Sequence, residues 1–305
     1  MSVLYALAGI RTPFLNEVML LLTNFGDETI LLIIAMLLFW CVDKRRGYRT
    51  MITAFTAMGI TMLIKVLVME ARPWVMDPAF TAVEAAKAGA YDYCFPSGHS
   101  STAAALYGSL ALYTKRKPLR IIYPCCALLV GFTRLYLGVH HPLDVLVGLI
   151  IGFGCALAWR PVLLRTEDNP RTTSAIHAAL VAFLVLSLII QHLKPVTAAA
   201  DPELDAVTMR DTGSMLGAAL AMTVSYRLER RYIRFENHTG LPVQLLRLSV
   251  GFLLVLAVRL ALKAVLPVAV WSNALRYFLM MLTGVALWPM CFARLDRLCG
   301  QPLQK

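Results

Sequence analysis

Long apolar runs separated by short polar connections make up most of this chain. Nine runs approach or reach the length of about 20 residues that one bilayer crossing requires, at 28–43, 50–69, 98–114, 119–137, 142–163, 174–193, 212–226, 243–267 and 275–294. The runs at 98–114 and 212–226 are short and rich in Gly, Ala and Ser, which is typical of closely packed membrane helices. The pattern predicts an all-α, polytopic transmembrane helix bundle of about nine spans.

The first 22 residues are apolar but interrupted by Arg11, Pro13 and Glu17. These interruptions favour an interfacial or re-entrant helix over a further span.

Composition and charge agree with a membrane protein. Of the 305 residues, 59% are hydrophobic and only 15% are charged, and soluble proteins carry about 25% charged residues. The basic residues gather in alternate connections, at 44–49, 115–120, 160–171, 227–234 and 294–305. The positive-inside rule places these connections in the cytoplasm and the N-terminus outside, most simply in a bacterial plasma membrane. The net charge of +11 therefore reflects topology, and we expect no nucleic-acid partner.

The seven cysteines lie mostly within or beside apolar runs and show no metal-ligand or disulfide spacing. We interpret most of them as small hydrophobic residues and predict no metal and no cofactor.

Two cations close the second apolar run. Lys65 and Arg72 are separated by six residues, and Pro73 follows. A spacing of seven positions equals two helical turns, so we expect both cations on one helix face, about 10 Å apart along the axis. Taken alone, such residues often only extend to the membrane interface.

A polar segment, Pro96-Ser97-Gly98-His99, comes directly before the third run. Ser97 can cap the helix that follows, and Gly98 allows a ligand to approach the backbone. Amides at a helix start bind anions, and His99 could donate a proton there. If this tetrapeptide is considered alone, ordinary helix capping explains it better.

A third polar segment, residues 131–144, ends with two histidines, Pro142 and Asp144. Pro142 is the natural first residue of a helix, which places Asp144 in the first turn. From there its carboxylate can reach back to residues 140 and 141 and orient an imidazole. The alternative is a solvated histidine pair with an aspartate that favours the helix dipole.

The predicted topology places these three segments on one face of the membrane. Cations, a hydroxyl and helix-start amides suit phosphate binding, and the two imidazoles with an aspartate suit covalent phosphoryl transfer.

In this arrangement the chain resembles the phosphatidic acid phosphatase type 2 superfamily, whose signature is K-x6-RP, PSGH and SR-x5-H-x3-D. The corresponding residues here are Lys65-x6-Arg72-Pro73, Pro96-Ser97-Gly98-His99 and Thr133-Arg134-x5-His140-x3-Asp144. Thr133 replaces the serine of the signature, so its phosphate contact carries over least directly.

The resemblance implies a metal-independent phosphatase that acts through a phosphohistidine. It assigns His140 as the nucleophile, Asp144 as the residue that fixes its tautomer, and His99 as the acid for the leaving oxygen. The phosphate ligands that it implies are Lys65, Arg72, Ser97, Gly98 and Arg134. The spacing from Arg134 selects His140 over His141.

The resemblance also divides the chain into an N-terminal segment at 1–27, a six-helix phosphatase core at 28–193 and a transmembrane extension at 194–305. The expected substrate is a lipid phosphate or an isoprenyl diphosphate, bound among membrane lipids on the non-cytoplasmic face. Two alternatives remain: a protein that binds or transports a phospholipid without hydrolysis, and a vanadate-dependent peroxidase. The latter shares the pocket but is soluble.

Overall fold

The computed structural model describes residues 1–166, 168–194, 200–237 and 239–299. Part of the predicted connection at 194–211 and the end of the last basic cluster, 300–305, lie outside these ranges. The described residues contain helices and no β-strand. In chain order the α-helices are α1 (Ser2–Ala8), α2 (Pro13–Thr23), α3 (Glu28–Leu37), α4 (Lys44–Val68), α5 (Pro73–Met76), α6 (Glu84–Lys87), α7 (Gly98–Tyr113), α8 (Leu119–Tyr136), α9 (Pro142–Thr166), α10 (Pro170–Leu193), α11 (Pro202–Leu228), α12 (Leu241–Val265), α13 (Val270–Leu282) and α14 (Phe292–Leu298).

The all-α, multi-pass architecture is confirmed. Among the described residues, six helical segments are long and apolar enough to cross a membrane. A seventh is possible if the segments 13–26 and 28–42, which meet at 53°, form one broken span; the same bend also fits a re-entrant loop. Three of the nine predicted spans are not among the six: 28–43, which belongs to this bent pair, and the runs at 98–114 and 212–226. The last two lie in α7, which has only 16 residues, and in α11, which also contains Arg210 and Asp211.

The chain folds as two compact units. The first comprises residues 1–32, 52–165 and 187–209, and the second comprises 33–51, 166–186 and the described part of 210–305. All the predicted site residues belong to the first unit.

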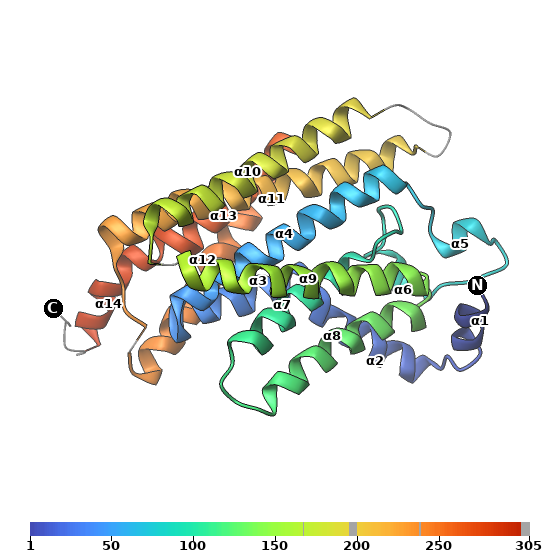
Figure 1. Ribbon diagram of the computed structural model, residues 1–305, viewed down its shortest axis with the longest axis horizontal. Coiled ribbons are helices and arrows are strands. Elements are labelled where there is room, and N and C mark those ends of the chain that lie inside the picture. The colour runs from blue at the N-terminus through green and yellow to red at the C-terminus, as the bar shows by residue number, and fades with distance from the viewer. Residues whose placement is uncertain (167, 195–199, 238, 300–305) are drawn as a thin grey trace. The chain divides into compact units, whose positions relative to one another are not determined.

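In the first unit α7 packs against α8 and α9 (Figure 1). Ten residues of α7 are buried, including several Ser and Thr, so this helix needs neither the length nor the hydropathy of one that faces lipid. Two glycines of α9 allow the close approach. A Cβ on Gly148 would lie 2.6 Å from Ser97 O, and one on Gly152 would lie 2.3 Å from Ser101 O. These glycines one turn apart form a small-residue stripe of the kind that brings membrane helices together.

The expectation that Lys65 and Arg72 lie on one face of one helix is wrong. Helix α4 ends at Val68, and Met69 takes a left-handed backbone conformation with φ of 54°. Arg72 then caps α5. The two cations are brought together by a loop residue and not by helical periodicity, as described below.

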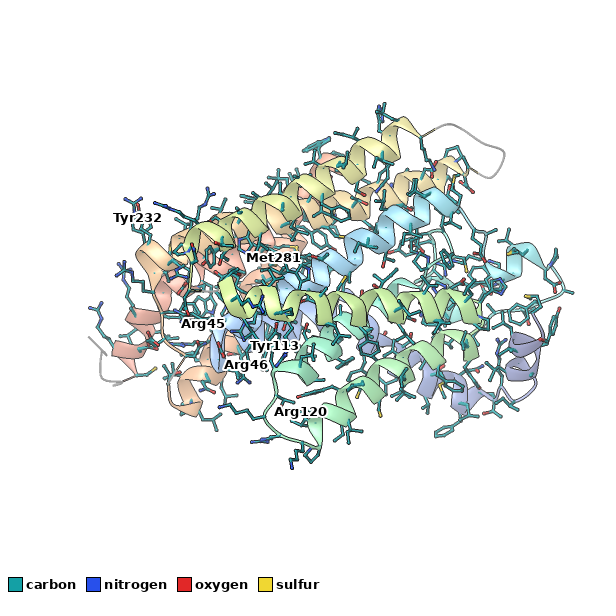
Figure 2. The ribbon with its side chains drawn as sticks, viewed as in Figure 1. Arg45, Arg46, Tyr113, Arg120, Tyr232 and Met281 are labelled. Atoms are coloured by element: carbon teal, nitrogen blue, oxygen red, sulfur yellow. The ribbon has the colours of Figure 1, made fainter. Side chains whose placement is uncertain are left out.

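The basic connection between α7 and α8 lies at one end of the first unit. Arg120 extends from the start of α8 (Figure 2), and its Nε donates to Thr114 O at 3.2 Å. The side chains of this connection are mainly exposed, as expected for a cation cluster at a membrane surface.

The second unit is held by a buried polar core. Arg247 of α12 is fully buried and donates to both oxygens of Asp296 at 2.8 and 2.9 Å. The indole Nε1 of Trp288 donates to Arg247 O at 2.9 Å, and that of Trp40 donates to Gly284 O at 2.8 Å. These bonds satisfy polar groups that would otherwise be costly in an apolar interior.

Candidate active site

The start of α7 is built as the sequence predicts. Ser97 is the N-cap, and its hydroxyl accepts from Ser100 N at 3.4 Å and from Ser100 Oγ at 2.9 Å. Ser97 N donates to Asp144 O at 3.0 Å, which fastens this turn to the start of α9. The position where Gly98 would carry a Cβ has no atom within 4 Å. The first turn of α7 therefore leaves open space beside its backbone.

The loop between α8 and α9 presents the predicted nucleophile. Val139 N donates to Arg134 O at 3.2 Å. Gly138 has φ of +77°, a region that favours glycine. A Cβ there would lie 2.5 Å from Nη2 of Arg11 and 2.8 Å from Cζ of Phe80. Arg11 also donates to Tyr136 O at 2.9 Å, so the N-terminal segment holds this loop in place.

Asp144 lies in the first turn of α9, which begins at Pro142 as predicted. Its Oδ2 lies 3.3 Å from His140 Nδ1 and accepts from His141 N at 2.7 Å. The predicted reach of this carboxylate back to residues 140 and 141 is therefore present. The imidazole of His141 takes no part in this contact, and its Nε2 has no partner among the described residues.

The three predicted phosphate-binding cations are nearly completely buried, with Lys65 1%, Arg72 5% and Arg134 2% exposed. Arg72 Nη1 donates to Val139 O at 2.9 Å and lies 3.0 Å from His140 Nε2. Arg134 Nη1 donates to Thr23 Oγ1 at 3.0 Å, while its Nε and Nη2 have no partner in the described part of the chain. Buried guanidinium donors without acceptors suit an incoming anion.

The partners of His140 assign its tautomer. An arginine only donates, so Nε2 must carry the lone pair that accepts from Arg72, and Nδ1 carries the proton toward Asp144. Burial and the charges of Arg72, Arg134 and Lys65 hold the pKa of His140 well below its ordinary value of 6.5. The imidazole is thus neutral at neutral pH, with its unprotonated nitrogen on the cation side.

His99 lies in the electrostatic field of the same group of charges, with Arg134, Asp92 and Arg72 among those that act on it. Thr133, which replaces the serine of the signature, is buried, and its hydroxyl donates to Val130 O at 2.6 Å. The hydroxyl of Thr133 is therefore bonded within its own helix.

Two residues near the site were missed by sequence analysis. Asp92 pairs with both Lys65 and Arg72, and nothing in the spacing of a loop aspartate announces such a contact. Cys94 had a positional signal, because it stands two residues before Pro96. Its Sγ lies 2.9 Å from Asp144 Oδ2 and 3.6 Å from His140 Nδ1.

Cys94, His140 and Asp144 also form a group that could hold a metal. Their ligand atoms all lie within 4.8 Å of one another, and all three residues are buried. Thiolate, imidazole and carboxylate are ligands of zinc and similar ions. The sequence shows no metal spacing because the fold, and not one helix or loop, assembles this group.

The helices define an integral membrane protein, and its candidate site gathers buried cations around an imidazole–carboxylate pair. Residues 47–167 match the PAP2 superfamily, and residues 213–301 match its transmembrane extension, described as PAP2 superfamily phosphatase, transmembrane extension. The chain belongs to the PAP2 superfamily.

The sequence is similar to those of three bacterial and archaeal relatives. The chain is 31% identical to a lipid A 1-phosphatase of Rhizobium etli, over 48% of this chain and 70% of the relative. It is 33% identical to phosphatidylglycerophosphatase B of Bacillus subtilis, over 47% of this chain and 72% of the relative. It is 29% identical to an undecaprenyl-diphosphatase of Sulfolobus acidocaldarius, over 45% of this chain and 66% of the relative. All three are phosphatases, and their names give three different substrates.

Proposed function

We propose that this membrane phosphatase removes the terminal phosphate of a lipid phosphate or isoprenyl diphosphate through a phosphohistidine at His140. The observation that carries the proposal is the placement of one neutral imidazole between Asp144 at Nδ1 and Arg72 at Nε2. The named activities of the relatives support the same substrate class.

The reaction has two steps. Nε2 of His140 attacks phosphorus, the N–P bond forms, and the bond from phosphorus to the leaving oxygen breaks. His99 gives its proton to that oxygen, while Asp144 stabilises the charge that develops on the ring. Water then attacks phosphorus with His99 as the base, the N–P bond breaks, and inorganic phosphate leaves. Lys65, Arg72, Arg134 and the amides after Ser97 stabilise the phosphoryl oxygens in both steps.

A substrate panel tests the proposal. Purified protein in detergent is supplied with phosphatidic acid, phosphatidylglycerophosphate, lipid A and an isoprenyl diphosphate, and phosphate release is measured for each. We expect release from at least one lipid, and no release by His140→Asn. A protein that binds these lipids but releases phosphate from none would instead be a non-hydrolytic lipid-binding or transport protein.

The active site is proposed to lie on the non-cytoplasmic face of a bacterial plasma membrane, and the segment 194–305 to be a membrane extension outside the catalytic core. The alternation of basic connections supports this orientation. In a variant without native cysteines, an impermeant thiol reagent applied to intact cells should label Glu84→Cys, whose side chain is 85% exposed in the wild type. It should not label Lys117→Cys, and the opposite pattern would place the site in the cytoplasm.

A further inference from the structure

A carboxylate already lies where two of the phosphate-binding cations would meet a phosphoryl group. Asp92, in the loop between α6 and α7, places Oδ2 at 3.1 Å from Lys65 Nζ and pairs through Oδ1 with Nη2 of Arg72. Burial pushes the pKa of Asp92 upward, but attraction to Lys65 and Arg72 outweighs burial and holds this pKa below 3.8. Because its two oxygens pair with two cations, the Asp92 carboxylate neutralises part of the cation cluster.

The donors of Arg72 and Lys65 are largely used by this arrangement. Arg72 donates from Nε to Asp92 O at 2.9 Å, from Nη1 to Val139 O, and from Nη2 to the Asp92 carboxylate. Lys65 donates to Tyr93 O and to Asp92. Arg134 differs, because its Nε and Nη2 have no partner in the described part of the chain. Arg134 thus has donors available to a ligand, whereas Lys65 and Arg72 are paired with the Asp92 carboxylate.

We propose that Asp92 is an internal competitor for the phosphoryl group: its carboxylate holds Lys65 and Arg72 in the resting enzyme and must leave before a substrate phosphate can bind all three cations. The inference rests on the proposed function in taking these three cations as phosphate ligands. Carboxylate and phosphoryl oxygens are interchangeable acceptors for a guanidinium and an ammonium, so the exchange conserves charge-assisted hydrogen bonds.

The backbone around Asp92 is fixed, so the exchange requires only rotation of one side chain. Arg72 Nε holds the carbonyl of Asp92. The next residue, Tyr93, donates through its hydroxyl to Asp205 Oδ1 at 2.7 Å and accepts from Asp201 N at 3.0 Å. The Asp92 side chain itself is 16% exposed, which gives the carboxylate a route toward solvent without opening of the loop.

A competitor of this kind weakens the binding of every anion in the ground state. The affinity falls as the fraction of molecules in which Asp92 occupies the cations rises. This benefits an enzyme at a membrane surface in two ways. Phosphodiester head groups surround the pocket at high concentration, and a resident carboxylate keeps their occupancy low. Inorganic phosphate is also a product, and the return of Asp92 to Lys65 and Arg72 promotes its release.

Equilibrium binding of inorganic phosphate to the purified full chain in detergent, measured by calorimetry, tests the proposal. Asp92→Ala should bind phosphate at least about tenfold more tightly than the wild type, and Asp92→Asn should be intermediate, because an amide competes more weakly for cations. The control is Asp77→Asn, in the connection between α5 and α6, whose carboxylate accepts from Tyr5 and contacts neither cation. It should bind phosphate as the wild type does.

If Asp92 instead serves to hold the cations in position, the change in phosphate affinity should have the opposite sign. In that case both Asp92 variants would bind phosphate more weakly than the wild type, and such a result would overturn the proposal, as would unchanged binding or no binding by any variant. Asp92→Asn conserves shape, so it provides the test if Asp92→Ala does not fold. Binding requires no turnover. Tighter phosphate binding by variants of a protein that hydrolyses none of the lipids would therefore refute the phosphatase function and retain the competitor.

Discussion

Arg72 Nη1 lies 3.0 Å from Nε2 of His140. This contact directs the unprotonated Nε2 of the imidazole, whose lone pair accepts from Arg72 in the resting site, toward the cation cluster, where a bound phosphorus atom would be attacked. The same contact distinguishes His140 from its neighbour His141, which bonds to Asp144 through its backbone N and whose imidazole Nε2 has no hydrogen-bond partner among the described residues.

We expect His140→Asn to lose phosphate release by at least about 10³-fold, because the variant lacks the unprotonated Nε2 that faces the cations. Trapping of the phosphoenzyme with labelled substrate in acid should fail in the same variant. His141→Asn is the matched control and should keep most activity. Retention of activity in His140→Asn with loss in His141→Asn would show that the neighbouring histidine is the nucleophile.

His99→Asn should respond to the leaving group. A general acid matters most for a poor leaving group such as a lipid alkoxide, so release from a lipid phosphate should fall by roughly 10²–10⁴-fold. An activated aryl phosphate should recover part of that loss in His99→Asn and none in His140→Asn. Equal losses on both substrates in His99→Asn would assign His99 to phosphate binding and not to proton transfer.

The pH profile should reflect the low pKa of His140, which burial, Arg72, Arg134 and Lys65 together produce. Only the unprotonated ring attacks, so kcat/KM limited by this group should fall only below pH 6.5. Lys65→Met removes a positive charge, raises the pKa of His140 and should move the acid limb to higher pH. The same substrate is used for both proteins, so its own ionisation cancels in the comparison. Lys87→Met, whose amine pairs with Glu84, should leave the limb in place, and a limb that moves to lower pH in Lys65→Met would contradict the electrostatic assignment.

Excess chelator should leave kcat/KM within about twofold of the untreated enzyme, because buried cations and helix-start amides take the role that metals play in other phosphatases. The group formed by Cys94, His140 and Asp144 makes this a sharp test, since a required metal would have three ligands there. Cys94→Ser should likewise remain active in chelator. Activity lost to chelator and restored by zinc or magnesium would assign that group to a catalytic metal.

Gly152→Ala should destabilise the protein by roughly 1–3 kcal/mol, because the new methyl group would meet the backbone of α7 and force the helices apart. Its Cβ would lie 2.3 Å from Ser101 O and 2.7 Å from Ala105 N. Thermal unfolding in detergent measures the effect. Gly154→Ala, on the same helix with no atom within 4 Å of the added group, is the control, and equal stability of the two variants would disprove close packing at Gly152.

Much of the fold could be predicted from the sequence because the hydropathy of a helix depends only on the residues within that helix. The predicted runs at 98–114 and 119–137 end within one residue of α7 and α8, and α9 begins at Pro142 as predicted. The reach of the Asp144 carboxylate back to residues 140 and 141 followed from helix geometry alone. The N-terminal segment and the division of the chain at residues 27 and 193 stay predictions.

The remainder depended on contacts between distant segments. Asp92 meets Lys65 across 27 positions of the chain, and the helix expected to unite Lys65 with Arg72 ends at Val68. Cys94 approaches Asp144 across 50 positions. Such contacts arise from packing of the whole unit, and neither periodicity nor a capping pattern encodes them.

The conformation of Gly138 matters when the sequences of related chains are compared with the signature. The signature writes five unspecified positions between Arg134 and His140, yet one of them is determined by a left-handed backbone and by two neighbouring side chains. A chain that matches every named letter of the signature but carries a bulky residue at this position needs a different path into its histidine. Glycine at this spacing is therefore a useful additional criterion for distinguishing chains that share this loop from chains that share only the letters.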